Sequence, residues 1–406
     1  MKVLWFVGGG IEAVPGIQRA KALGLYVVVS DGNPHAPGFK FADDKVIVST
    51  YDVTATVEKA LIYTRQRKIN GVICIASDIP HTVAAVAKAL NLPGIPLEMA
   101  NIMMDKAAMK DYFGLHHIPI PWYQALDSVE ALKRIIIKRG NDLVIKPVDS
   151  RGARGVLHLN ADVDLTWAYE YAKNESPTGR VMVEQFLAGP QVSTESLVQN
   201  GIAYTLGFAD RNYELLQRYA PHMIENGGDL PSHLIETQKK QVRDLIQQVV
   251  TALGIKNGVV KGDIVIHDNQ ATVIEVAPRL SGGYFCTHEI PLNTGVDFVG
   301  SAISLALGDE IPESALIAQY DRPVCQRYLF TEPGEVMSID GFEEILQRSD
   351  IAFCEIRVKV GDVIPVVSNH LARPGVVIAT GATAMEAKKN AESAIQSISL
   401  KIRALG

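Results

Sequence analysis

Two carboxylates and an arginine stand close together in the stretch from Val259 to Gly283. Apolar and polar residues alternate on both sides of the turn Asp268-Asn269-Gln270, which predicts a β-hairpin. Asp263 and Glu275 can lie across from one another on its two arms, with Arg279 just beyond. Carboxylate oxygens hold hard divalent cations, and a guanidinium binds phosphate. The stretch is a candidate cation and phosphate site, although ordinary hairpins also carry paired acids that face solvent.

A glycine-bearing loop follows the expected strand Leu143–Lys146 and contains Ser150, Gly152 and Gly155. Backbone N–H groups of such a loop can contact phosphate oxygens, and the lysine that ends the strand adds a positive charge. The loop is not a Walker A sequence, because G-x-x-x-x-G-K-[ST] is absent. A plain hairpin turn is the alternative interpretation.

An extended segment, Val183 to Gln191, joins two of the expected modules. Its backbone can pair with the edge of an adenine, Glu184 can accept a hydrogen bond from the exocyclic amine, and Gln191 can reach a ribose hydroxyl. A linker turn with a surface glutamate explains the same residues.

The first glycines of the chain support a different hypothesis. Gly8-Gly9-Gly10-Ile11-Glu12-Ala13 satisfies G-x-G-x-x-A between a strand and a helix, and Asp31 ends the next strand, where a ribose-binding acid would stand. Gly8, Gly10 and Asp31 would then hold NAD. The same glycines also occur wherever a strand turns sharply into a helix.

Strands and helices alternate up to about Gly94, which predicts a doubly wound parallel sheet. The expected strands are Val3–Val7, Leu25–Ser30, Val46–Val48 and Val72–Ala76, and the expected helices are Val14–Leu23, Val53–Arg67 and His81–Leu90. A helix over Leu97–Phe113 follows. The rest of the chain predicts an α+β module around the glycine loop, then the hairpin, then a smaller α/β region that ends in a helix over Ala384–Arg403.

Composition restricts the class of protein. The chain has 406 residues, 47% apolar and 21% charged, which is typical of a globular protein of two or three domains. A net charge of -6 argues against nucleic-acid and membrane partners, since both require clustered cations. Four widely spaced cysteines and no run of 18 apolar residues favour a cytoplasmic protein without a zinc site or disulfides. A homodimer is compatible with these features.

The order of these motifs along the chain resembles the ATP-grasp superfamily of carboxylate-amine ligases. The resemblance is carried by D-K-x-x-M at Asp105–Met109, V-I-K-P-V-D-S-R-G-A-R-G at Val144–Gly155, V-E-Q-F-L-A-G-P-Q at Val183–Gln191 and E-V-A-P-R-L-S-G-G at Glu275–Gly283. It implies a pre-ATP-grasp domain over residues 1–95, an ATP-grasp domain of two α+β subdomains over 96–308, and a C-terminal domain over 309–406. Residues from about 118 to 185 would form a mobile lid.

The resemblance also implies roles for individual residues. Lys106 and Lys146 would contact the phosphates of ATP beneath the loop that contains Ser150, Gly152 and Gly155. Glu184, Phe186 and Leu187 would hold adenine and Gln191 the ribose, while Asp263 and Glu275 would ligate Mg²⁺ or Mn²⁺. Arg279 and Lys146 would act in catalysis, and the turn Ser281-Gly282-Gly283 would face an acyl phosphate.

Two residues depart from the usual pattern of the superfamily. Gln191 replaces the usual ribose-binding glutamate, and Ala277 replaces the asparagine that many members carry two residues after the metal-binding glutamate. The pattern Glu-x-Ala-x-Arg is similar to that of the L-amino-acid ligases, which form dipeptides. That branch is favoured over the purine-biosynthetic members, carbamoyl-phosphate synthetase and biotin carboxylase.

The expected reaction is therefore the ATP-dependent joining of a small carboxylic acid to an amine through an acyl phosphate, and an amino acid is the favoured acid substrate. A carboxylase or purine-type ligase is the main alternative, and a catalytically weak ATP-binding protein or an NAD-dependent oxidoreductase follow. Asp78 and His81 lie just past a strand's carboxyl end and could meet the substrate's amino group. A helix cap by Asp78 is the competing interpretation.

Overall fold

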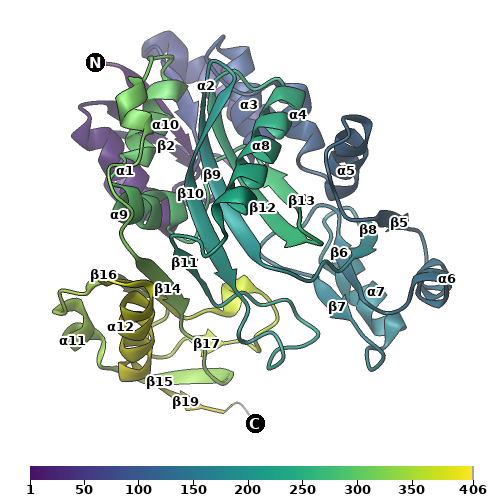
Figure 1. The fold of residues 1–406 in the computed structure, drawn as a ribbon. Coiled ribbons are helices and arrows are strands. Elements are labelled where there is room, and N and C mark those ends of the chain that lie inside the picture. Colours follow the sequence, from purple (N-terminus) through teal and green to yellow (C-terminus); the bar gives the residue numbers. More distant parts are fainter. Residues whose placement is uncertain (405–406) are drawn as a thin grey trace. The chain divides into compact units, whose positions relative to one another are not determined.

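The computed structural model describes residues 1–404, which form two compact units. The first unit contains residues 1–120, 193–208 and 235–320, and the second contains 121–192, 209–234 and the residues from 321 onward. Each unit is thus assembled from separate pieces of the chain, as the interleaved colours of Figure 1 show. The three consecutive domains expected from the sequence stay a proposal.

A parallel sheet opens the first unit, in the strand order β3-β2-β1-β4. Its strands are β1 (Val3–Val7), β2 (Tyr26–Asp31), β3 (Asp44–Ile47) and β4 (Gly71–Ile73), and its helices are α1 (Val14–Ala22), α2 (Val53–Gln66) and α3 (Pro80–Ala89). The predicted doubly wound α/β fold is confirmed. Every residue of β1 is buried, as expected for a parallel strand covered on both faces.

Alternate residues of β1 show how the two faces are covered. Trp5 packs in one core cluster with Ala60 of α2 and Val86 of α3. On the other face, a Cβ added at Gly16 of α1 would lie 3.6 Å from the ring of Phe6. Helices therefore cover both faces, which positions the loops at the carboxyl ends of the strands.

Two short helices, α4 (Leu97–Ile102) and α5 (Lys106–Leu115), stand where the sequence predicted one. Asp105 separates them, because its carboxylate accepts hydrogen bonds from the backbone N–H groups of Ala107 and Ala108 at 2.9 and 3.0 Å. An aspartate N-cap of this kind starts a new helix instead of continuing the old one. The prediction of a single helix was wrong at this point.

The second sheet of the first unit contains the predicted hairpin, β12 (Gly258–His267) and β13 (Gln270–Ala277), beside β9 (Gln191–Gln199) and β10 (Ile202–Asn212). The turn is only Asp268 and Asn269, with φ of 47° and 61°. Two positive φ angles match the twist of a tight hairpin. Helix α8 (Glu236–Ala252) contacts both arms. The unit also contains α9 (Ile290–Thr294), α10 (Phe298–Ala306), a π-helical turn at Phe285–Glu289, and 3-10 turns at Ile11–Ala13, Pro37–Lys40 and Glu313–Leu316.

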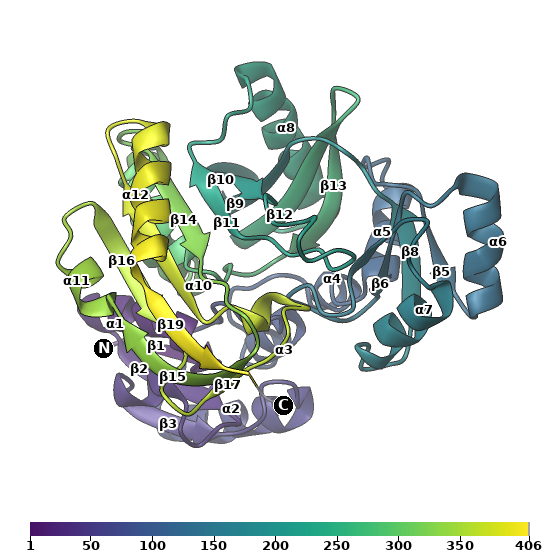
Figure 2. The same ribbon diagram turned by 90° about the horizontal axis from the view of Figure 1, so that it is seen from below.

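An antiparallel sheet in the order β5-β8-β6-β7 begins the second unit. It comprises β5 (Tyr123–Leu126), β6 (Leu143–Pro147), β7 (Leu157–Leu159) and β8 (Val181–Gln185). Helices α6 (Val129–Arg139) and α7 (Leu165–Asn174) pack beside this sheet, as Figures 1 and 2 show. The sequence missed β5, which is short and largely exposed.

The remainder of the second unit is built on two further groups of strands. The last residues of β10 pair with β11 (Gly227–Leu230), followed in order by β14 (Val324–Tyr328), β18 (Gly375–Thr380) and β16 (Ile351–Ile356). A three-stranded sheet is formed by β17 (Val363–Ile364), β15 (Gly334–Asp340) and β19 (Ser399–Arg403). The helices are α11 (Phe342–Leu346), α12 (Ala384–Ser397) and a 3-10 turn at His370–Ala372.

The last predicted helix is too long. Helix α12 ends at Ser397, and residues 399–403 form β19, which pairs with β15. Leu400 and Ile402 alternate with exposed residues, a period of two that fits a strand with one covered face. None of the helices in residues 1–404 is long and apolar enough to cross a membrane.

Candidate active site

Asp263 and Glu275 lie directly opposite one another in the hairpin of β12 and β13. Asp263 is buried, and its two oxygens are engaged separately. Ser193 Oγ donates to Oδ1 at 2.9 Å, and Lys261 Nζ lies 2.5 Å from Oδ2. This acid is therefore held on both sides by the protein.

Glu275 is the more open of the two acids, with 39% of its side chain exposed. Its Oε1 lies 3.3 Å from Nζ of Lys106, the first residue of α5. Each acid of the hairpin thus has its own lysine. Two carboxylates fit a hard cation, and residues 1–404 contain no group of three or more His, Cys, Asp or Glu side chains suited to a metal. The rest of a cation's coordination would come from phosphate or water oxygens.

Arg279 follows β13 and is paired with Asp78. Its Nε donates to Asp78 Oδ1 at 2.7 Å, and its Nη2 donates to the same oxygen. Burial alone would lower the pKa of this guanidinium, but the Asp78 carboxylate offsets the effect and raises the pKa above its ordinary value. Helix α3 has Ile79 at its N-cap and no side-chain cap, so the interpretation of Asp78 as a helix cap was wrong. His81 is half-buried in the first turn of α3.

The turn Ser281-Gly282-Gly283 is held by two acids that the sequence reasoning missed. Glu195 of β9 is buried and accepts hydrogen bonds from Ser281 N, at 2.8 Å, and from Ser281 Oγ. Glu12 accepts from Gly283 N at 2.8 Å. A Cβ at Gly282 would lie 2.7 Å from Glu12 Oε2, which favours glycine there. In the sequence Glu195 stands between Thr194 and Ser196, so no apolar pattern marked it as a buried acid.

Glu195→Gln is expected to change how stability depends on pH. Burial raises the pKa of Glu195 from 4.5 to about 7, although hydrogen bonds from Ser281 oppose the shift. A raised carboxyl pKa means that stability present below pH 4.5 is lost as the pH rises through about 7. The wild type should therefore lose about 3 kcal/mol over this interval relative to the glutamine variant. Urea denaturation of both proteins from pH 4.5 to 8 tests this, and parallel curves would contradict it.

The glycine turn after β1 has a structural explanation that needs no dinucleotide. Asp31 accepts hydrogen bonds from the backbone N–H groups of Gly9 and Asn33, both at 2.8 Å. A Cβ at Gly9 would lie 2.8 Å from Val29 Cγ1, so the close packing itself requires glycine. The acid that the NAD hypothesis assigned to a ribose is used to close this loop.

In the second unit, Lys146 and Glu184 form a buried ion pair with Nζ and Oε1 2.5 Å apart. Only 5% and 4% of their side chains are exposed. The lysine lies diagonally across from the glutamate on the neighbouring strands β6 and β8. The sequence analysis gave them separate partners, phosphate and adenine, whereas here each is the other's partner.

Phe186 and Leu187 follow β8 and differ in their surroundings. The Phe186 ring stacks on His158 of β7, with centroids 4.1 Å apart and planes inclined by 26°. Leu187 is buried, and the half-buried Gln191 is the first residue of β9. His158 was not among the predicted site residues, and its position in a short strand carried no signal of this contact.

The glycine loop after β6 is closely packed at Gly155 and has free space beside the Cα atom of Gly152. Gly152 and Gly155 have φ of 61° and 72°, which non-glycine residues rarely adopt. A Cβ at Gly155 would lie 2.7 Å from Pro147, whereas one at Gly152 would meet nothing within 4 Å. Gly152 O accepts a hydrogen bond from His370 N at 3.1 Å, and Ser150 is buried.

The predicted site residues therefore form two groups. The first unit contains Asp78, His81, Lys106, Asp263, Glu275, Arg279 and Ser281–Gly283, and the second contains Lys146, Ser150, Gly152, Gly155, Glu184, Phe186, Leu187 and Gln191.

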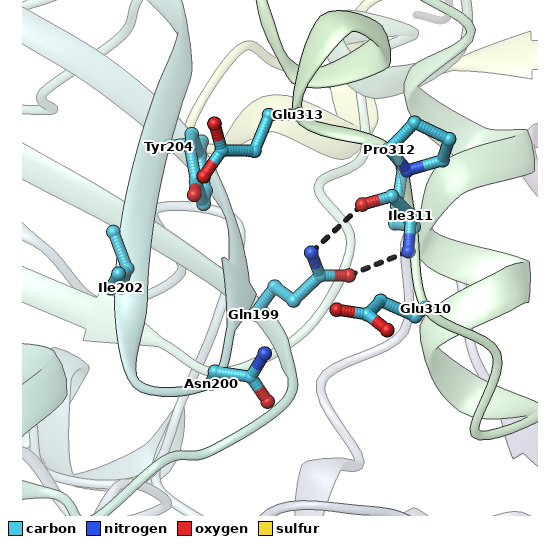
Figure 3. A pocket seen from close by; sticks show the side chains of 8 residues that line it. All are labelled: Gln199, Asn200, Ile202, Tyr204, Glu310, Ile311, Pro312 and Glu313. Carbon is cyan, nitrogen blue, oxygen red and sulfur yellow. Dashed lines mark hydrogen bonds between the residues drawn. The ribbon is translucent and has the colours of Figure 1, made fainter.

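A pocket of about 380 Å³ lies elsewhere on the first unit. Figure 3 shows that the Gln199 side chain makes two hydrogen bonds with Ile311, which fasten residues 310–313 to the end of β9. The pocket is lined by Gln199, Asn200, Ile202, Tyr204 and Glu310–Glu313. None of them is a predicted site residue, and none is a lysine or arginine that would attract phosphate.

Two family descriptions match separate parts of the chain. Residues 103–283 match the ATP-grasp domain, and residues 327–403 match the L-amino acid ligase C-terminal domain 2. Residues 103–283 are therefore an ATP-grasp domain, the domain of a class of ADP-forming ligases, as the motifs predicted. Residues 327–403 are similar to a C-terminal domain of the L-amino acid ligases within that class.

Known relatives extend over nearly the whole chain. A formate-dependent phosphoribosylglycinamide formyltransferase of Burkholderia lata is 24% identical over 96% of this chain and 92% of its own. The L-amino acid ligase of Bacillus licheniformis has a TM-score of 0.82 at 21% identity and covers 100% of this chain and 99% of its own.

A second similar structure is the biotin carboxylase domain of the 2-oxoglutarate carboxylase of Hydrogenobacter thermophilus, solved with MgADP. Its TM-score is 0.74 at 18% identity, over 99% of this chain and 91% of its own. At these identities the structural likeness establishes the fold. ATP-grasp enzymes as a class use ATP and magnesium.

Proposed function

We propose that this protein is an ATP-dependent ligase that joins an amino acid, through its carboxylate, to an amine by way of an acyl phosphate. ADP and phosphate are released. The observation that carries the proposal is the opposition of Asp263 and Glu275 in one hairpin, with the half-buried Arg279 two residues after β13. This arrangement combines a cation site with a fixed positive charge for a transferring phosphoryl group.

Asp263 and Glu275 are the proposed ligands of Mg²⁺ or Mn²⁺, which when bound would neutralise charge on the triphosphate. Lys106 already contacts Glu275 at 3.3 Å, so its ammonium is placed to reach a phosphate that approaches this acid. In the second unit, Lys146, Ser150, Gly152 and Gly155 are the proposed phosphate-binding residues of the glycine loop. Glu184, Phe186 and Leu187 are proposed to hold adenine, and Gln191 the ribose.

No nucleophile from the protein is needed for the two chemical steps. The substrate carboxylate attacks the γ-phosphorus, a carboxyl-oxygen–phosphorus bond forms, and the bond from the γ-phosphorus to its bridging oxygen breaks as ADP leaves. The amine nitrogen then attacks the carbonyl carbon, phosphate departs with the bonding electrons, and the amine loses a proton. Arg279 of the first unit is proposed to offset the negative charge that develops in these steps, and Lys146 of the second unit is the other residue proposed to act in catalysis.

The turn Ser281-Gly282-Gly283 is proposed to face the acyl phosphate, because Glu12 and Glu195 hold it rigidly two residues after Arg279. Asp78 and His81 are the proposed contacts for the substrate's amino group. Asp78 also orients Arg279, so a change at Asp78 should affect catalysis as well as substrate binding.

An amino acid is the preferred acid substrate for two reasons. The pattern Glu275-x-Ala277-x-Arg279 lacks the usual asparagine, and residues 327–403 match a domain of L-amino acid ligases. The full-length similarity to the phosphoribosylglycinamide formyltransferase supports a purine-type ligase as the second candidate.

The test supplies ATP, Mg²⁺, hydroxylamine and single amino acids to the purified protein. Hydroxamate should form together with ADP and phosphate, since hydroxylamine captures an acyl phosphate even when the natural amine is unknown. Release of AMP and pyrophosphate would overturn the mechanism. ADP release that depends on bicarbonate alone would favour a carboxylating enzyme, and release with formate and phosphoribosylglycinamide would favour the purine-type candidate.

A further inference from the structure

Lys261 lies beside the proposed cation site. In the register of the hairpin, Lys261 pairs with Ala277, two residues from the opposed pair of Asp263 and Glu275. Side chains two residues apart on a strand share one face. Lys261 therefore shares the face of both acids, opposite the position where many ATP-grasp proteins carry an asparagine.

The ammonium of Lys261 reaches the buried acid of the pair. Its Nζ is 2.5 Å from Asp263 Oδ2, and only 19% and 13% of the two side chains are exposed. Ser193 donates to the other oxygen at 2.9 Å. A charge pair with little solvent around it is screened weakly, so removing either partner is unfavourable.

Each acid on this face is paired with a lysine. Asp263 and Glu275 supply two negative charges, and Lys261 and Lys106 supply two positive ones. The ions are farther apart in the Lys106–Glu275 pair than in the Lys261–Asp263 pair, with 3.3 Å between Lys106 Nζ and Glu275 Oε1. In addition, 39% of the Glu275 side chain is exposed. Glu275 is thus the acid more accessible to an incoming cation, and Asp263 is the acid already neutralised.

We infer that the Lys261 ammonium occupies the place of a second divalent cation, so that the site binds one cation per bound nucleotide. The inference rests on the proposed ATP-dependent function. A second cation next to Asp263 would lie within a few ångströms of the ammonium, and like charges at that distance repel strongly where solvent is scarce. Ala277 offers no oxygen to compensate. The single cation would bind Glu275 and a remaining lone pair of Asp263.

Counting bound Mn²⁺ by electron paramagnetic resonance tests the inference directly. The wild type, saturated with the non-hydrolysable analogue β,γ-methylene-ATP, should bind one Mn²⁺ tightly per chain. Lys261→Met combined with Ala277→Asn should bind two, because the ammonium is gone and an amide oxygen is added. Lys261→Met alone should strengthen Mn²⁺ binding by at least about tenfold.

Lys240→Met is the matched control, since Lys240 on α8 is paired with the exposed Asp244 and should leave Mn²⁺ binding unchanged. Two tight Mn²⁺ ions in the wild type would overturn the inference, and so would unchanged Mn²⁺ affinity in a folded Lys261→Met protein. If circular dichroism shows that Lys261→Met is unfolded, the wild-type count and Lys261→Arg, which keeps the charge and should bind one Mn²⁺, decide the question.

Nucleotide binding, measured separately by calorimetry, distinguishes this inference from the function on which it rests. Normal binding of the analogue with two Mn²⁺ ions would overturn the role of Lys261 and leave the ligase proposal standing. Failure to bind ATP or the analogue at any Mn²⁺ concentration would overturn both.

Discussion

Glu275→Gln is expected to lower turnover by about a thousandfold while the protein stays folded. The amide keeps the size of the side chain but removes the negative charge that would hold the cation against the triphosphate. It would also leave Lys106 without its acidic partner, 3.3 Å away, which makes the site more positive and less attractive to a metal. Because 39% of the Glu275 side chain is exposed, the cost in stability should be small.

Steady-state kinetics with ATP and the amino acid identified by the hydroxamate test would measure this effect. Mn²⁺ binding and circular dichroism would separate loss of the cation from loss of the fold. Glu236→Gln, in an exposed pair on α8, is the control and should be as active as the wild type. Retention of more than about a tenth of wild-type turnover by Glu275→Gln would remove this acid from the cation site.

Lys146→Met is expected to have the largest effect on stability, about 3 to 5 kcal/mol. Lys146 and Glu184 are both almost completely buried, with Nζ and Oε1 2.5 Å apart. Removal of the lysine would take away the ammonium that offsets the charge of this buried carboxylate beside the core of the β5-β8-β6-β7 sheet. The midpoint of urea denaturation should fall accordingly.

A second substitution separates the structural role of this lysine from its proposed role toward phosphate. Lys146→Met with Glu184→Gln removes both charges and should regain most of the lost stability, because no unpaired charge is left in the interior. ATP binding should stay weak in the double variant. Full recovery of ATP affinity together with stability would show that Lys146 acts only as the partner of Glu184.

Local patterns along the chain predicted the hairpin correctly. The alternation of apolar and polar residues determines which side chains share a face, and a two-residue turn at Asp268 and Asn269 determines the register. That register alone would pair Asp263 with Ile274, and a β-bulge between Asp263 and Ile264, which only the structure shows, brings Asp263 opposite Glu275. The same reasoning predicted the parallel sheet, because buried strands alternating with amphipathic helices leave few other folds.

Contacts between distant residues were not predictable in this way. Arg279 pairs with Asp78 across 201 positions, and Gly283 with Glu12 across 271. The sequence around an acidic residue does not indicate which hydrogen-bond donor will contact its carboxylate. Glu195 illustrates the point, since its partner Ser281 lies 86 positions away.

By itself, therefore, the sequence determined the class of fold, the hairpin with its two acids and the glycine loop, because short-range periodicity and turn chemistry act within a few residues. Only the tertiary structure decided the partners of charged groups that are distant in the sequence: Lys146 with Glu184 and Arg279 with Asp78. A buried charge is unfavourable unless an opposite charge lies beside it. Which residue supplies that opposite charge depends on how strands and loops from separate segments are packed, and no local sequence pattern specifies it.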